Sequence, residues 1–345
     1  MKEIGSEFWQ IESENLTKKR DLKYFEDLGI DVKYLMSGRT AIDYILKNIV
    51  DKKKIVYMPN YCCSSMVQPF IDNGYNIEYY KVDLIKKRYY INDKFNCSIF
   101  FAMSYFGYED SNMDDYIKKF KTNNVVVLED ITHRIFCQKN HCEEADYLIA
   151  SLRKWFPIYT GAIAVNKNGN FKKNIDNYTV NKELVKYKKQ AMQLKREYIY
   201  GINNECKDIF LNLFNKSNKL IADYKNKKID RESLEILKSI NLENVKEKRI
   251  YNTKIIEENF VNSANISLLY NYKNGDCPLF VPIISKNRDN IRKKLIENNI
   301  YCPIHWTSFN NSNNEIYANE LSLICDQRYA KEDMELEVKI VFENI

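Results

Sequence analysis

The chain has 345 residues, of which 45% are hydrophobic, and a net charge of +6 from 53 basic and 47 acidic residues. This length can bury a large core, and a mixed surface with a mild basic excess argues against a nucleic-acid-binding protein. No run approaches the roughly 20 apolar residues of a membrane span, and the first seven residues lack the apolar core of a signal peptide. We therefore expect an enzyme-sized cytoplasmic protein that binds neither nucleic acid nor membrane.

The nine cysteines are scattered along a long chain without a secretion signal, which favours reduced thiols over disulfides. Cys137, His141 and Cys142 could ligate a metal, but no second Cys/His pair completes four ligands at a familiar spacing. We predict no metal site.

Short apolar runs alternate with helical patterns from residue 34 to about 165, which is typical of a mostly parallel sheet flanked by helices. The pattern predicts strands at 55–58, 77–82, 98–103, 125–129, 147–150 and 162–165. It predicts amphipathic helices at 40–49, 64–73 and 113–120. The fold class is therefore α/β.

The pattern changes after residue 179. Residues 179–260 are charged, have helical periodicity and contain almost no Gly or Pro, which predicts long helices. Beyond them we expect a small α+β unit with strands at 278–284 and 300–304 and helices at 288–298 and 331–342. The predicted division is a large α/β domain at 1–180 with an N-terminal arm at 1–33, connecting helices at 181–260, and a small C-terminal domain at 261–345.

One lysine follows a buried strand directly. Residues 147–150 predict a strand, an irregular turn then carries Ser151 and Lys154, and Gly161 precedes the next strand. A lysine in a partly dry pocket can have a lowered pKa and form a Schiff base. A surface lysine in a loop is the plainer interpretation of this segment alone.

A carboxylate and a histidine follow another apolar strand. Asp130 ends the run that begins at Val125, and His133 lies three residues further on. Ligands of open α/β sheets bind at the carboxyl ends of the strands. Pyridoxal phosphate needs a carboxylate against its ring nitrogen, and His133 could contact the ring. A helix cap and an ordinary buried imidazole are the alternatives.

The first predicted helix opens with a turn of small and hydroxyl residues, in which Ser37, Gly38, Arg39 and Thr40 are consecutive. Helix N-termini bind phosphate through free backbone N–H groups, and glycine permits close approach. Together with Ser151, this turn could hold the phosphate of the cofactor. A plain capped helix would have the same sequence.

The order of these segments resembles the DegT/StrS sugar aminotransferases, which are fold-type I pyridoxal phosphate enzymes. The resemblance is carried by the turn at 37–40, by Asp130, and by Ser-x-x-Lys about twenty residues after it. The stretches 58–65, 74–83 and 104–107 are also similar to the family. It covers residues 30–170 and extends more loosely to His305-Trp306 and to 323–329.

The resemblance implies Lys154 as the catalytic Schiff-base lysine and Asp130 as the partner of the ring nitrogen. It implies a phosphate site and ring contacts made by Gly38, Arg39, Thr40, Tyr61, His133 and Ser151. Tyr105, His305 and Trp306 are candidate substrate contacts. The implied activity moves an amino group from glutamate to a nucleotide-linked keto sugar, for aminosugar or surface-polysaccharide synthesis. The implied partners are a small-molecule amino donor, a carbonyl acceptor and a second copy of the chain.

Four features depart from the family pattern. Thr160-Gly161-Ala162 replaces its Asp-Gly-Gly, the stacking aromatic is often found at the position of Cys62, its Gly-x-Asn-x-Arg loop is missing, and Lys154 follows Ser151 closely. Another pyridoxal phosphate reaction on an amino acid or sugar, or a non-catalytic binding protein of the same fold, therefore stays an alternative. A nucleotide-binding Rossmann protein is disfavoured because Gly-x-Gly-x-x-Gly is missing.

Overall fold

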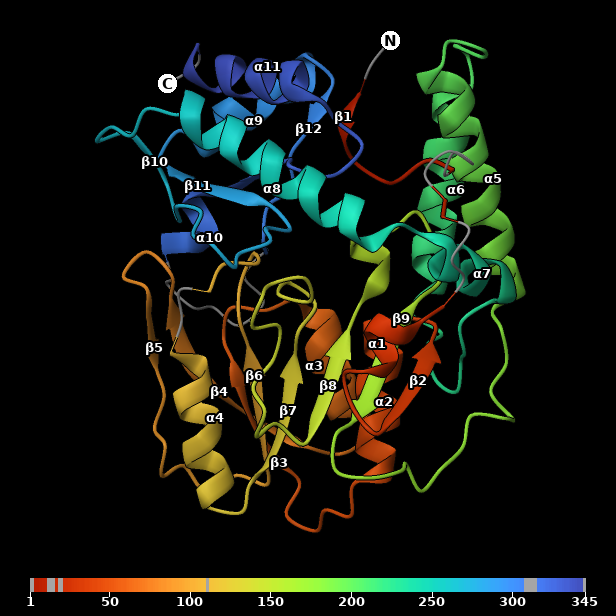
Figure 1. Ribbon diagram of the computed structural model, residues 1–345, viewed down its shortest axis with the longest axis vertical. Coiled ribbons are helices and arrows are strands. Elements are labelled where there is room, and N and C mark those ends of the chain that lie inside the picture. The colour runs from red at the N-terminus through yellow and green to blue at the C-terminus, as the bar shows by residue number, and fades with distance from the viewer. Residues whose placement is uncertain (1–2, 11–15, 18–20, 110–111, 307–314, 344–345) are drawn as a thin grey trace.

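The computed structural model describes residues 3–10, 16–17, 21–109, 112–306 and 315–343. The large sheet occupies the lower half of Figure 1, with the C-terminal strands and helices above it on one side and a helical group on the other. Within the described residues, no helix is long and apolar enough to cross a membrane.

The large sheet has eight strands in the order β2-β9-β8-β7-β6-β3-β4-β5. Pairs among β8, β7, β6, β3 and β4 are parallel, whereas β2, β9 and β5 pair antiparallel. The strand bounds are β2 (Asp31–Leu35), β3 (Ile55–Pro59), β4 (Asn76–Asp83), β5 (Arg88–Tyr90), β6 (Ile99–Met103), β7 (Val126–Asp130), β8 (Tyr147–Ala150) and β9 (Ala162–Asn166). The predicted α/β class with a mostly parallel sheet is confirmed.

Helices α1 (Lys23–Glu26), α2 (Gly38–Asn48), α3 (Ser64–Asp72) and α4 (Met113–Thr122) accompany this sheet. Helix α2 begins at Gly38 because the preceding Ser37 is extended and its side chain accepts a hydrogen bond from the Thr40 amide. The helices predicted at 40–49, 64–73 and 113–120 are confirmed to within two residues at every end.

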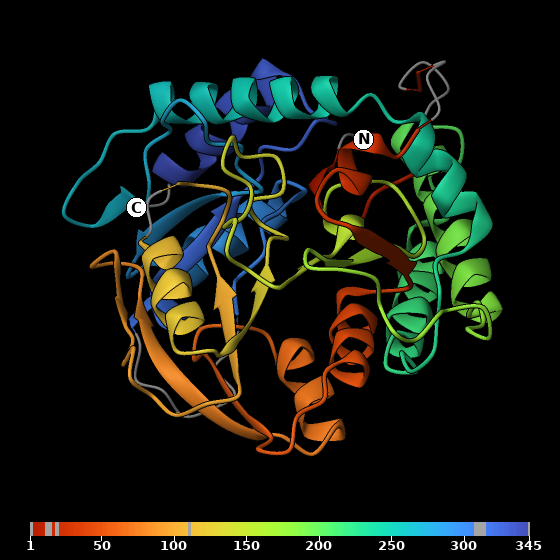
Figure 2. The same cartoon turned by 60° about the horizontal axis from the view of Figure 1, so that its bottom comes forward.

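The charged middle of the chain forms the predicted long helices. They are α5 (Lys182–Ile199), α6 (Lys207–Leu220), α7 (Arg231–Ser239) and α8 (Leu242–Asn259). Figure 2 shows α5 and α6 side by side at the right edge of the molecule, and α8 running across the top of the view. Asn181, Asp230 and Asn241 cap α5, α7 and α8 through their side chains.

The C-terminal segment forms an antiparallel sheet of β10 (Ile266–Leu268), β11 (Val281–Ser285) and β13 (Glu320–Leu323). Helices α9 (Arg288–Glu297), α10 (Glu315–Asn319) and α11 (Lys331–Phe342) accompany it. The strand predicted at 300–304 is shorter, because β12 (Ile300–Tyr301) pairs only with the two residues of β1 (Ile4–Gly5). Most buried apolar residues of this segment pack with Ile4 and the end of α8 in a second cluster, while Leu269, Leu279 and Ile316 belong to the main cluster. The predicted domain boundaries stay a prediction.

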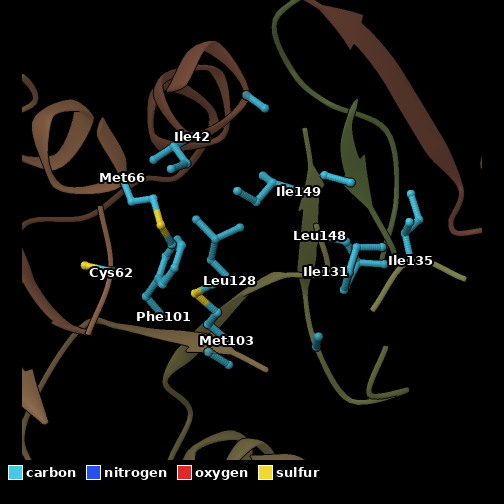
Figure 3. Close-up of a cluster of buried hydrophobic side chains, with 14 of the residues drawn as sticks. Ile42, Cys62, Met66, Phe101, Met103, Leu128, Ile131, Ile135, Leu148 and Ile149 are labelled. Carbon is cyan, nitrogen blue, oxygen red and sulfur yellow. The ribbon is translucent and has the colours of Figure 1, made fainter. Parts of the chain in front are cut away.

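The main core lies between the large sheet and its helices. Figure 3 shows Ile42 and Met66, from α2 and α3, pointing towards Leu128, Ile149 and other apolar side chains of the sheet. These side chains are nearly or fully inaccessible to solvent, which removes most of their apolar surface from water. This packing holds the N-terminal ends of α2 and α3 in place relative to the carboxyl ends of the strands, where the candidate site lies.

Candidate active site

A cavity of about 570 Å³ lies where α2 begins and β7 and β8 end. Ile42, Met66 and Ile149, seen in Figure 3, contribute to its apolar wall. The rest of its lining comes from five parts of the chain: Ser37, Gly38, Arg39, Cys63, Ser65, Asp130, Thr132, Ser151, Arg153, Lys154, Asn218 and Lys219. We call it the first cavity. It brings together Gly38, Arg39, Asp130, Ser151 and Lys154 of the sequence-predicted set.

Asp130 is the last residue of β7 and is 5% exposed. Its Oδ1 accepts a hydrogen bond from the Thr132 amide at 2.8 Å. Burial raises the pKa of Asp130, while the hydrogen bond from Thr132 and the charge of Lys154 act in the opposite direction. A buried carboxylate in a cavity gains most from a nearby cation or N–H donor.

His133 is buried beside the lysine. The Phe106 amide donates to its Nδ1 at 3.0 Å, and its Nε2 lies 3.5 Å from Nζ of Lys154. Burial lowers the pKa of His133 well below its ordinary value, with further lowering by Lys154 and His305. The ring stacks on Trp306 at a centroid distance of 5.9 Å.

The start of α2 forms one wall of the first cavity. The first amides of a helix have no intrahelical partner, and here Ser37 satisfies only that of Thr40. Thr40 itself is fully buried, with its hydroxyl 3.0 Å from that of Ser37, and it does not line the cavity. A Cβ added at Gly38 would lie 3.5 Å from Cβ of Ser151, so the glycine keeps the wall open.

Lys154 ends a short 3₁₀ helix, Leu152–Lys154, that follows β8. Two contacts hold this turn: Ser151 donates its amide to the hydroxyl of Thr132 at 2.9 Å, and Trp155 Nε1 donates to the Thr132 carbonyl at 2.6 Å. Lys154 is itself exposed in the single chain. The described residues of one chain therefore do not form the partly dry pocket expected from the sequence.

Tyr61 and Tyr105 lie outside the first cavity. Both are buried, and they pack in an aromatic cluster with Trp306 and Tyr317. The hydroxyl of Tyr61 donates to the carbonyl of His305, and the hydroxyl of Tyr105 donates to the carbonyl of Tyr61 at 2.6 Å. The structure thus places Tyr61, the predicted ring-stacking residue, next to the candidate substrate residues.

A second cavity of about 380 Å³ adjoins the same turn, because Arg153 and Lys154 line both. His305 lines this second cavity with its amide bonded to Glu320 at 2.7 Å and its Nδ1 2.8 Å from the hydroxyl of Ser322. The other lining residues are Ser6, Glu7, Phe8, Arg249, Leu279, Phe280, Tyr301, Pro303, Ile324, Asp326 and Arg328.

Sequence reasoning missed six residues of the first cavity: Cys63, Ser65, Thr132, Arg153, Asn218 and Lys219. Arg153 sits between the predicted Ser151 and Lys154, and its basic character next to the lysine was the available signal. Asn218 and Lys219 come from α6, more than sixty residues away in sequence from Lys154. No local pattern marks them.

No family model matches the sequence, and no curated protein matches it. Solved structures do share the fold. Helicobacter pylori PseC, described as an aminotransferase involved in the biosynthesis of pseudoaminic acid, has a TM-score of 0.68 and 14% identity, covering 99% of each chain. A DegT DnrJ EryC1 StrS aminotransferase from Brucella abortus has a TM-score of 0.63 and 12% identity, over 93% of this chain and 88% of that one.

A third solved structure, NtdA from Bacillus subtilis with bound cofactor PMP, has a TM-score of 0.62 and 14% identity, over 96% of this chain and 79% of its own. At these identities the likeness shows the fold. It confirms that the chain folds like the aminotransferases that its sequence resembles.

Proposed function

We propose that this protein is a pyridoxal-phosphate-dependent aminotransferase that moves an amino group from glutamate to a nucleotide-linked keto sugar. One observation carries the proposal. The start of α2, Asp130 and Lys154 line a single cavity at the strand ends of a fold shared with an aminotransferase of pseudoaminic acid biosynthesis.

The residues of the first cavity fit this cofactor. The free amides at the start of α2, the hydroxyl of Ser151 and the guanidinium of Arg39 would hold its phosphate. Nε of Arg39 is buried and donates to no acceptor among the described residues, so its N–H is available to donate a hydrogen bond to a ligand. Asp130 would face the ring nitrogen of the cofactor. Burial raises the pKa of this carboxyl, and the positive charge on the protonated nitrogen would lower it again.

When bound, pyridoxal phosphate supplies an electron sink for negative charge that develops on a substrate carbon. The protein's own residues would bind, orient and move a proton. Lys154 would hold the cofactor, and its freed Nζ would take up the proton that leaves the substrate. The buried, neutral imidazole of His133 would donate a hydrogen bond from Nε2 towards that region.

We also propose that two copies of the chain form the working enzyme. Lys154 is exposed in one chain, whereas a reacting amine is best kept from bulk water. A second copy that covers this opening would exclude water. Light scattering of the purified protein tests the proposal, and a monomer at micromolar concentration would contradict it.

The function is tested by the visible spectrum of the purified protein with added pyridoxal phosphate. We expect a band that is missing in Lys154→Ala and that bleaches when glutamate is added. The bleached protein should regain the band with a nucleotide-linked keto sugar. A folded protein without any band would reject the cofactor, and a band that glutamate leaves unchanged would reject transfer from glutamate.

A further inference from the structure

Positively charged side chains outnumber carboxylates in the lining of the second cavity. Two of its carboxylates are already paired: Asp326 contacts Arg328, with Nη2 and Oδ2 2.7 Å apart, and Glu7 contacts Lys188 at 2.5 Å. Burial alone would raise the pKa of Glu7, but Lys188 outweighs it and lowers the pKa to about 2. Glu7 is therefore an ionised partner of Lys188.

Three cations that line this cavity make no ion pair with a described carboxylate: Arg153, Lys154 and Arg249. Lys154 is the lysine proposed to hold the cofactor, which leaves Arg153 and Arg249. Nε of Arg153 is buried and donates to no acceptor among the described residues. The charge of Glu7 attracts Arg153, whereas the charge of Arg39 repels Arg153. The carboxylate of Glu7 already accepts hydrogen bonds from Lys188 and Asn218. Arg153 is half-buried, and a partly desolvated cation without a hydrogen-bonded anion is costly, so a ligand anion would stabilise Arg153.

Arg249 is held in a fixed orientation. It is 1% exposed, its guanidinium lies 4.5 Å from the centroid of the Trp155 ring, and Nε donates to the side-chain oxygen of Gln327 at 2.9 Å. Nη1 donates to the carbonyl of Leu279 at 3.0 Å. Its hydrogen-bond partners in the described chain are thus neutral. Arg249 also helps to lower the pKa of Asp326, but that carboxylate is already paired with Arg328, so the guanidinium of Arg249 can still bind a ligand anion. A planar, preorganised guanidinium suits a carboxylate.

We propose that Arg153 and Arg249 bind a carboxylate of the amino donor in the second cavity, and that Arg153 determines selectivity for acidic donors. This inference rests on the proposed function, because it places the donor next to Lys154, which lines both cavities. Arg153 immediately precedes Lys154, so a carboxylate held there brings the donor to the lysine.

The test measures binding of glutarate, a dicarboxylate without an amino group, to cofactor-free protein by titration calorimetry. We expect Arg153→Gln to raise the dissociation constant roughly tenfold or more, because a hydrogen-bonded charge is lost. Arg153→Lys keeps the charge without the planar fork and should give a smaller increase. Arg231→Gln removes the same charge from an exposed position on α7 and serves as the matched control. Arg249→Lys replaces Arg153→Gln if the latter fails to fold.

Four results would overturn the inference: no glutarate binding, equal affinity in Arg153→Gln, Arg153-dependent binding of inorganic pyrophosphate that is tighter than that of glutarate, or an equal loss in Lys219→Gln. The third would assign the arginines to a diphosphate, and the fourth would place the anion in the first cavity, which Lys219 lines. The titration needs no cofactor. Arg153-dependent glutarate binding by a protein that never acquires the visible band would therefore reject the proposed function and leave the carboxylate site standing.

Discussion

Nε2 of His133 lies 3.5 Å from Nζ of Lys154, on the side of the ring away from the Phe106 amide. That amide donates to Nδ1, and a ring nitrogen that accepts a hydrogen bond carries no proton. The proton of the neutral imidazole is therefore on Nε2, facing the lysine. Burial is the main reason that the ring stays neutral.

A neutral buried histidine predicts lower stability in acid. Its pKa is lowered in the folded chain, so the unfolded chain binds the proton first as pH falls below about 6.5. The contribution of His133 to the free energy of unfolding is fully present above that pH. Below it, the free energy of unfolding declines by up to about 1.4 kcal/mol for each pH unit. Urea unfolding between pH 7 and 5 should show a shallower decline for His133→Gln than for the unaltered protein. Equal slopes would contradict a neutral His133.

For Glu337 we predict the opposite pH dependence, in which stability falls as pH rises. Its Oε1 accepts the Ile324 amide at 2.9 Å, while Oε2 is buried without an acceptor or donor among the described residues. Burial raises its pKa to about 8. The folded chain keeps this proton, whereas the unfolded chain loses it near pH 4.3, so stability falls as pH rises from about 4.3 to about 8.

Glu337→Gln keeps the shape of the side chain and cannot ionise. We expect its urea midpoint to exceed that of the unaltered protein by more at pH 8.5 than at pH 5. Both proteins should be measured in the same buffers. A gain that is larger at pH 5 would show that the carboxyl is ionised in the folded chain.

The main sheet could be predicted because its central strands are buried on both faces. Every residue of β6 and of β9 is buried, and both are continuous apolar runs except for Asn166 at the end of β9. Strand β13 could not be predicted, since its Glu320 and Ser322 are polar although buried. They bond to the amide and ring of His305, a partner that no local pattern reveals.

Gly107 makes the turn that brings the Phe106 amide to His133. Its φ is +89°, and an added Cβ would lie 2.2 Å from the carbonyl oxygen of Cys277. Gly107→Ala should destabilise the fold by at least about 2 kcal/mol, because backbone strain and a clash with main chain add. Gly74→Ala is the matched control, since its φ is +75° but nothing lies within 4 Å. Chemical denaturation of both variants tests this, and equal losses would show that the clash is relieved.

A substitution at Gly38 should weaken cofactor binding while leaving the free energy of unfolding almost unchanged. An added Cβ would be in ordinary contact with Ser151 at 3.5 Å, so Gly38→Ala should change the unfolding free energy by less than about 1 kcal/mol. It would narrow the wall of the first cavity and weaken pyridoxal phosphate binding severalfold. A titration followed by absorbance, with the unfolding curve as control, tests both parts. Unchanged affinity would mean that the phosphate lies elsewhere.

The site was predictable in part for a similar physical reason. Asp130 ends β7 and Lys154 follows β8, and the ends of these neighbouring strands meet at one edge of the sheet. Arg249 and Lys219 approach from helices far away in sequence, so their place depends on tertiary packing. Tyr61 was predicted from the resemblance to contact the ring, and the structure places it in the aromatic cluster with Trp306.

The central claim is that Lys154 holds the cofactor. Borohydride would fix a lysine-bound pyridoxal phosphate permanently, and mass spectrometry of the digested protein then identifies the modified residue. We predict a single pyridoxyl adduct, on the peptide that contains Lys154, which disappears in Lys154→Ala. An adduct on another lysine, or equal labelling of many lysines in the folded protein, would contradict the account.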